Sequence, residues 1–232
     1  MSFCPISDKR VVRLSLAFGL AFCLWTVMFS PWTHSWVPFW YGMPVAAAML
    51  ITIACLWGGN PLKDVRYRSG EIMLMAAEAV VLAAALWGVF WIGDKASQWL
   101  FPSFARVQVN NVYSLRDGWR PEAIAALLFC LIGPAEEIFW RGYVQRTLTE
   151  WLVGKESTLR DRLSARGLVA LALSIFLYTI IHLFSFNFML IMSALVCGLI
   201  WCTLYWLFPR RLPMLILSHA IWDAAVFVWF PI

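Results

Sequence analysis

Long apolar stretches separated by short polar segments dominate the pattern of this 232-residue chain. Seven of the stretches approach or exceed the roughly 20 apolar residues that a helix needs to cross a bilayer. We expect transmembrane helices at about residues 11–30, 38–57, 71–93, 122–145, 167–186, 188–208 and 214–230. The pattern therefore predicts an all-α, polytopic membrane bundle of about seven helices, which forms a single transmembrane domain over residues 1–232.

The longest polar interruption is predicted at residues 94–120. It mixes Trp99, Phe101 and Phe104 with charged side chains, so part of it is expected to lie in the membrane interface. An eighth, re-entrant element in this region would not change which side of the membrane each end of the chain faces.

Composition supports a membrane protein. Hydrophobic residues make up 62% of the chain and charged residues only 13%, against about 25% charged residues in soluble domains. The net charge of +5 does not indicate nucleic acid, because the basic residues fall between the apolar stretches. Five of the six cysteines lie within apolar stretches and no CxxC motif occurs, so we interpret them as small core residues.

The distribution of basic residues predicts the orientation, because Lys and Arg gather in cytoplasmic loops. With the N-terminus in the cytoplasm, thirteen Lys and Arg residues lie on the cytoplasmic side and four on the other side. The thirteen are Lys9, Arg10, Arg13, Lys63, Arg66, Arg68, Arg146, Lys155, Arg160, Arg162, Arg166, Arg210 and Arg211, and the four are Lys95, Arg106, Arg116 and Arg120.

Three ionisable residues stand together inside the fourth predicted span: Glu136, Glu137 and Arg141. Each such group at membrane depth costs about 2.5–3.5 kcal/mol on insertion scales. Glu137 and Arg141 are four residues apart on one helical face and are expected to pair. Glu136 points about 100° away and is free to face something else. An ion network that only fixes helix packing is the structural alternative.

Two histidines and an aspartate lie in other predicted spans. Tyr178 precedes His182 by four residues, and Asp223 follows His219 by four, so each pair shares a helical face. Intramembrane ionisable groups usually face a protein interior or a water-filled space. These groups and the Glu-Glu-Arg cluster could therefore converge on one polar cavity.

The motifs that are absent from the sequence narrow the range of possible catalytic mechanisms. The chain has no HExxH motif, no GxSxG motif and no cysteine with an activating neighbour. A glutamate with two histidines suits the activation of water. Glu136 would act as general base, His182 would hold the water, and His219 would face the oxyanion of a tetrahedral intermediate.

The predicted depths of these side chains disagree. At a rise of about 1.5 Å per residue, Glu136 lies about 15 Å, His219 about 8 Å and His182 about 24 Å from the cytoplasmic ends of their spans. Helix tilt, a break at Gly133-Pro134 or different helix boundaries would have to bring them together.

Three ordered motifs resemble the CAAX protease and bacteriocin-processing (CPBP) family, which includes the type II CAAX prenyl endopeptidases. Its patterns EExxxR, FxxxH and HxxxN/D correspond to Glu136-Glu137-x-x-x-Arg141, Tyr178-x-x-x-His182 and His219-x-x-x-Asp223. The resemblance covers about residues 120–230, the expected catalytic core. It implies that Glu136 and His182 activate water, that His219 and Asp223 form the oxyanion site, and that Glu137 and Arg141 support them.

Two positions depart from the familiar pattern. Tyr178 stands in place of Phe, and Asp223 stands where the best-known CAAX proteases have Asn. An ionised Asp cannot donate a hydrogen bond to an oxyanion. Either Asp223 is protonated or it orients and charges His219, and we favour the second interpretation.

The resemblance implies a glutamate-type intramembrane endopeptidase that needs no cofactor. It would cut near the C-terminus of a membrane-anchored or lipidated protein or peptide, in a bacterial cytoplasmic membrane. One alternative is a zinc-dependent version with Glu136, His182, His219 and Asp223 as ligands. Another is a non-enzymatic carrier or bacteriocin-immunity protein that relays protons or binds a peptide uncut. The expected partners are the lipid bilayer and a peptide or protein substrate, and not nucleic acid.

Overall fold

The chain is a bundle of apolar helices. In the computed structural model, which describes residues 8–63 and 68–232, seven helical segments are long and apolar enough to cross a membrane. They are Lys9–Phe29, Phe39–Gly58, Ser69–Leu100, Pro121–Leu152, Ala165–Ser185, Phe188–Leu207 and Pro209–Trp229. This confirms the predicted all-α, polytopic class. Cys4, one of the six cysteines, and Arg66, one of the thirteen basic residues assigned to the cytoplasmic side, lie outside the described residues.

Some of these spans are single helices and others combine several helical elements. The described elements, in chain order, are α1 (Asp8–Phe29), α2 (Phe39–Gly58), α3 (Ser69–Leu100), α4 (Pro102–Tyr113), η1 (Ser114–Arg116), α5 (Pro121–Leu127), η2 (Leu128–Ile132), α6 (Gly133–Phe139), η3 (Trp140–Gln145), α7 (Arg146–Leu152), α8 (Leu159–Arg162), α9 (Ala165–Ile180), η4 (Leu183–Ser185), α10 (Phe188–Leu207), η5 (Pro209–Arg211), α11 (Leu212–Ala224) and η6 (Ala225–Trp229).

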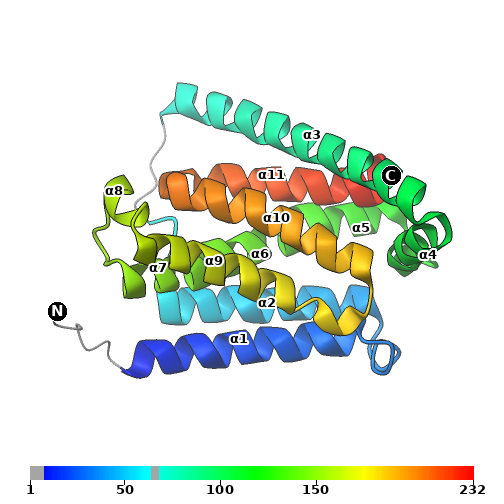
Figure 1. Cartoon of the computed structure of the whole chain (residues 1–232), viewed down its shortest axis with the longest axis horizontal. Coiled ribbons are helices and arrows are strands. Elements are labelled where there is room, and N and C mark those ends of the chain that lie inside the picture. The colour runs from blue at the N-terminus through cyan, green and yellow to red at the C-terminus, as the bar shows by residue number, and fades with distance from the viewer. Residues whose placement is uncertain (1–7, 64–67) are drawn as a thin grey trace.

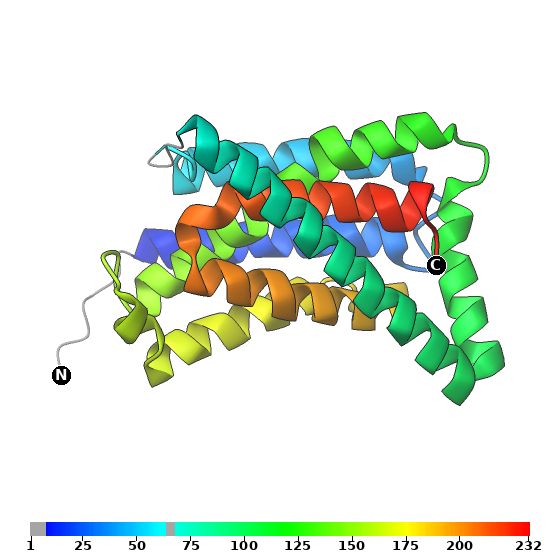
Figure 2. The ribbon, with the colours of Figure 1, turned by 90° about the horizontal axis from the view of Figure 1, so that it is seen from above.

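The long helices run roughly side by side, with α3 crossing the others at an angle and α4 lying across one end of the bundle (Figures 1 and 2). The expected loop at residues 94–120 is therefore wrong for most of its length. Helix α3 continues to Leu100, and Pro102 opens α4 after a single non-helical residue, Phe101. Proline fits the first turn of a helix and disfavours helical geometry in the residue before it, which explains the sharp turn.

The fourth span is one continuous helical path with two widened, π-helical turns, η2 and η3, on either side of α6. Pro134 has no N–H to donate, and its ring would crowd the carbonyl of Cys130, four residues earlier. Cys130 lies within η2, so the first widened turn occurs where a regular helix would clash. Such turns are frequent at functional sites.

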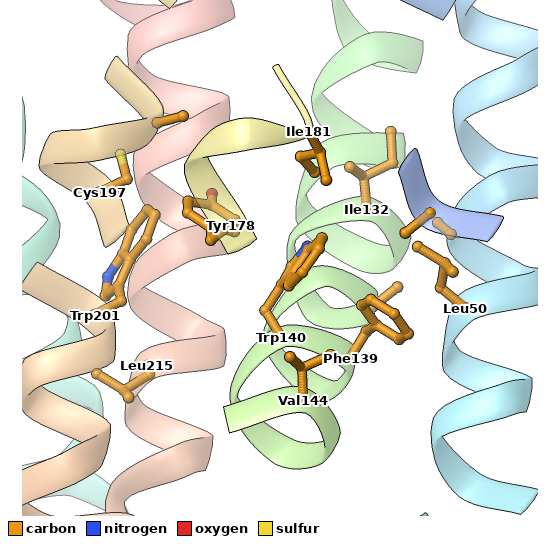
Figure 3. Close-up of a cluster of buried hydrophobic side chains, with 14 of the residues drawn as sticks. Leu50, Ile132, Phe139, Trp140, Val144, Tyr178, Ile181, Cys197, Trp201 and Leu215 are labelled. Carbon is orange, nitrogen blue, oxygen red and sulfur yellow. The ribbon is translucent and has the colours of Figure 1, made fainter. Parts of the chain in front are cut away.

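The core sits where this fourth span meets the neighbouring helices. Figure 3 shows Phe139 and Trp140 of the fourth span between Leu50 of α2 on one side and Tyr178 of α9 and Trp201 of α10 on the other. The rings of Trp140 and Tyr178 meet edge to face at 5.5 Å. The buried aromatic side chains thus surround the helix that carries the acidic motif.

Candidate active site

Glu137 and Arg141 form the predicted pair. The Oε1 atom of Glu137 lies 2.9 Å from Nη1 of Arg141, and both side chains are completely buried. The guanidinium also lies over the ring of Tyr178, at 4.4 Å, and near that of Trp201, at 5.6 Å. A carboxylate and two aromatic faces therefore compensate a cation that has no access to solvent.

His219 contacts carboxylates on both sides of its ring. Its Nδ1 atom lies 2.7 Å from Glu137 Oε1, and its Nε2 atom lies 3.5 Å from Asp223 Oδ2. The imidazole also stacks on Trp201, with ring centroids 3.9 Å apart. Glu137, which the sequence assigned only to Arg141, is thus the closer partner of His219. That Asp223 orients His219 stays a prediction, and Glu137 is a second orienting carboxylate because it accepts the shorter hydrogen bond from Nδ1 of His219.

His182 lies just after the end of α9. Its Nδ1 atom lies 3.2 Å from the carbonyl oxygen of Tyr178. A carbonyl only accepts hydrogen bonds, so Nδ1 carries the hydrogen in this contact and Nε2 of the neutral ring keeps its lone pair. The rings of Trp25 and Phe29 flank the imidazole at 6.5 and 6.0 Å. His182 is therefore held in one orientation with one nitrogen available as an acceptor.

Glu136 and Glu137 face different surroundings, as their helical spacing predicted. Glu137 is fully buried, whereas Glu136 is partly exposed and lines a cavity of about 980 Å³. The same cavity is lined by His182, His219 and Asp223, and also by Tyr178. All four residues proposed from the sequence as catalytic thus border one space, while Glu137 contacts His219 from behind.

The difference in expected depth is reduced by the observed helix boundaries. The fourth span runs on to Leu152, which places Glu136 about 24 Å from that end at 1.5 Å per residue. His182 lies about 26 Å from Ala165, the start of its span, by the same rise. His219 comes out shallower, at about 15 Å from Pro209. Its direct contact with Glu137 nevertheless fixes it in the same site.

Most of the cavity wall is apolar. Away from the carboxylates and histidines it is formed largely by aromatic and aliphatic side chains of α1, α2, α3, α4 and α10, and it extends as far as Phe101 and Phe104 beside the α3–α4 turn. A long apolar ligand fits such a space better than a polar one. Over residues 8–63 and 68–232, no group of three or more His, Cys, Asp or Glu side chains is arranged to hold a metal ion.

Sequence reasoning missed Trp201 and the second role of Glu137. Trp201 lies in an unbroken apolar stretch, so nothing in the pattern distinguishes it from the other core tryptophans. A signal for Glu137 was available, because a carboxylate can accept several hydrogen bonds and its ion pair with Arg141 leaves room for another partner.

Together, the seven spans and the buried carboxylate–histidine site define an integral, multi-pass membrane protein whose polar site lies inside the bundle. Residues 118–225 match the family model described as type II CAAX prenyl endopeptidase Rce1-like. The match confirms the resemblance to the CAAX protease (CPBP) family over this part of the chain, and it supports CAAX-type membrane protease activity. No curated protein and no solved structure matches the chain.

Proposed function

We propose that this protease is a glutamate-type endopeptidase that hydrolyses a peptide bond near the C-terminus of a membrane-anchored or lipidated protein or peptide. The observation that carries the proposal is that Glu136, His182, His219 and Asp223 line a single cavity. The largely apolar wall of that cavity supports a substrate with a lipid chain or an apolar segment.

In the proposed reaction, a water molecule lies between Glu136 and the free Nε2 atom of His182. Glu136 takes one proton while the water oxygen attacks the carbonyl carbon of the scissile bond. The resulting oxyanion accepts a hydrogen bond from Nε2 of His219. The C–N bond then breaks, and Glu136 passes its proton to the leaving amine, which restores the carboxylate.

The supporting residues act through His219 in this scheme. Glu137 accepts from Nδ1 of His219 and thereby turns Nε2 toward the cavity. Arg141 holds the same Glu137 oxygen in place through an ion pair. Tyr178 contributes its ring to Arg141 and its carbonyl to His182, so it links the two halves of the site.

The distribution of basic residues supports an N-terminus in the cytoplasm. The seven apolar helices support a place in a membrane, and we propose that this is a bacterial cytoplasmic membrane.

The proposal is tested by the variant Glu136→Gln, which removes the base and keeps the side-chain size. We expect a loss of about 100-fold or more in activity, the lower end of the range for a general base, at unchanged expression. C-terminal peptides of whole cells with the wild-type protein or the variant identify the substrates that are no longer cut. Glu122→Gln, an exposed carboxylate in the first turn of α5, is the matched control. Equal activity of wild type and Glu136→Gln would refute the catalytic assignment.

Metal dependence is tested separately, because the zinc alternative uses the same four residues. We expect EDTA and 1,10-phenanthroline to leave the activity of the purified protein essentially unchanged, since Glu136 and His182 suffice to activate water. Stoichiometric zinc in the purified protein, with activity lost on its removal and regained on its return, would instead establish a metalloprotease.

A further inference from the structure

A second pocket, separate from the catalytic cavity, lies at the end of the bundle where α1 begins and α2 ends (Figure 1). Its volume is about 350 Å³, and it shares no lining residue with the cavity that contains Glu136. Among the described residues that line it, five are basic and one is acidic: Arg10, Arg13, Lys63, Arg146, Lys155 and Glu150.

Glu150, the one carboxylate in the described lining of this basic pocket, does not balance the charges of Arg10, Arg13, Arg146 and Lys155. Glu150 lies 3.7 Å from Arg10 through one oxygen and 3.9 Å from Arg146 through the other. Lys63 has an interaction of its own, and the other four cations of the described lining still outnumber this one carboxylate. Like charges around one pocket repel one another, and a bound anion relieves that repulsion.

One wall of the pocket is fixed by the packing of helices, although Arg146 is the only one of its five basic side chains that is not exposed. Arg146 donates a hydrogen bond to the carbonyl oxygen of Gly58 and is mostly buried. A Cβ atom on Gly58 would come within 2.5 Å of the Tyr143 ring and 3.0 Å of Arg146 Nη2. The end of α2 therefore packs directly on the fourth span, and this contact orients one guanidinium of the site.

We propose that the basic pocket binds a phosphate group, supplied either by the headgroup of an anionic phospholipid or by free phosphate. Its volume lies within the range of small-molecule sites, about 300–1,000 Å³. The guanidinium group of Arg and the ammonium group of Lys are the side-chain groups that bind phosphate. The pocket opens at the end of apolar spans, where headgroups lie, and basic pockets between transmembrane helices bind such headgroups. Trp57, in its wall, is a residue typical of that depth.

The test uses the full-length protein in neutral detergent, without any assay of proteolysis. In one arm dioleoylphosphatidylglycerol is titrated against a phosphatidylcholine control. In the other arm potassium phosphate is titrated at constant ionic strength, and a third titration uses an acidic peptide. The midpoint of thermal unfolding reports binding, because a ligand of the folded state raises it, and native mass spectrometry counts retained lipids.

Three double variants make the test specific. The first, Arg13→Gln/Lys155→Gln, removes two exposed cations of the pocket. The second, Arg160→Gln/Arg166→Gln, removes two exposed cations outside it and is the matched control. The third, Arg13→Lys/Lys155→Arg, keeps the charge. We expect saturable binding to the wild type in at least one of the lipid and phosphate arms. The pocket variant should bind roughly tenfold or more weakly, and the other two variants should bind like the wild type.

The arm that responds identifies the source of the phosphate. Equal losses in the pocket variant and the matched control would show general attraction to a basic surface and would overturn the proposal. It would also be overturned by the absence of saturable binding in both arms, or by binding of the acidic peptide alone.

Discussion

At the scale of single residues, the shared oxygen of Glu137 is the centre of the site. The same atom, Oε1, contacts Arg141 at 2.9 Å and His219 at 2.7 Å, so one carboxylate couples the buried cation to the histidine at the cavity. For Glu137→Gln we expect lower activity and a loss of about 3–5 kcal/mol in stability, because the variant leaves a buried guanidinium uncompensated. Thermal unfolding in detergent, with Glu136→Gln as the stable comparison, measures the difference. Equal unfolding midpoints for the two variants would contradict this role.

The second prediction for a single residue concerns Asp223. It lies 3.5 Å from Nε2 of His219, beside the position proposed for the oxyanion. The negative charge of Asp223 favours a positively charged His219, and a charged donor stabilises an oxyanion better than a neutral one. We therefore expect Asp223→Asn to lower kcat about tenfold with little change in KM, because the interaction acts mainly in the transition state.

The rival outcome for Asp223 is informative. An Asn side chain can itself donate a hydrogen bond, whereas an ionised Asp cannot. An unchanged or increased kcat in Asp223→Asn would show that this position serves as an oxyanion donor and not as the partner of His219. Steady-state kinetics on one peptide substrate separate the two roles.

At the scale of elements, the site depends on how closely α6 approaches α11. A Cβ atom added to Gly133 would lie 3.0 Å from the Cα atom and 3.1 Å from the backbone nitrogen of Ala220. These are backbone atoms, so the helices themselves would have to separate. Ala220 directly follows His219, and Gly133 begins the helix that carries Glu137. The contact between the two helices thus sets the distance between Glu137 and His219.

For Gly133→Ala we expect a loss of about 1–3 kcal/mol in stability, as is usual for overpacking, together with reduced activity. Gly19→Ala is the matched control, because Gly19 also lies within a helix and has nothing within 4 Å of the added Cβ. Thermal unfolding and peptide cleavage are measured on both. A Gly133→Ala protein as stable and active as the control would show that the helices separate without consequence.

At the scale of the whole molecule, α4 and η1 tie down the last turns of the chain. The Tyr113 hydroxyl donates to the carbonyl of Val226 at 2.9 Å and accepts from the backbone N–H of Ile232 at 3.0 Å. Arg116 donates to the carbonyl of Phe227 at 3.0 Å. These carbonyls belong to η6, at the end of the final span, where the last carbonyls of a helix have no further helical N–H groups to accept from. Tyr113 of α4 and Arg116 of η1 therefore complete the hydrogen bonding of the final span.

Burial raises the pKa of Tyr113 above its ordinary value. The folded protein then keeps this proton at a pH where the unfolded chain, with an ordinary tyrosine pKa of about 10, has released it. The stabilisation is complete below about pH 10 and is lost as the pH rises further. We expect Tyr113→Phe to be less stable than wild type by about 1 kcal/mol near neutral pH. We also expect its unfolding midpoint to fall less steeply above about pH 10.

Unfolding midpoints measured across this alkaline range check the prediction, with Tyr41→Phe as the control. Tyr41 is 65% exposed, so its variant should follow the wild type. Parallel curves for wild type and Tyr113→Phe would show that the hydroxyl makes no contribution that depends on pH.

The sequence predicted the parts of this molecule that depend on local spacing. Helical periodicity and apolar length gave the seven spans, the pairing of Glu137 with Arg141 and the divergence of Glu136. It could not give contacts between helices. The stack of Trp201 on His219 and the bond from His219 to Glu137 depend on how α10 and α11 rotate about their axes. An apolar stretch in which every face is hydrophobic carries no signal for that rotation.

The apolar wall of the large cavity has a consequence for the order of events. Truly apolar cavities stay dry, and a buried water needs two to four polar partners to remain in place. Here a minority of the lining residues, Glu136 and His182 among them, offer such partners, while most of the surrounding wall is apolar. Few water molecules are then available in the cavity for the proposed hydrolysis. An apolar substrate that fills the cavity would exclude further water. In the proposed reaction the attacking water must therefore bind before the substrate. After each turnover a new water molecule must bind before the next substrate enters.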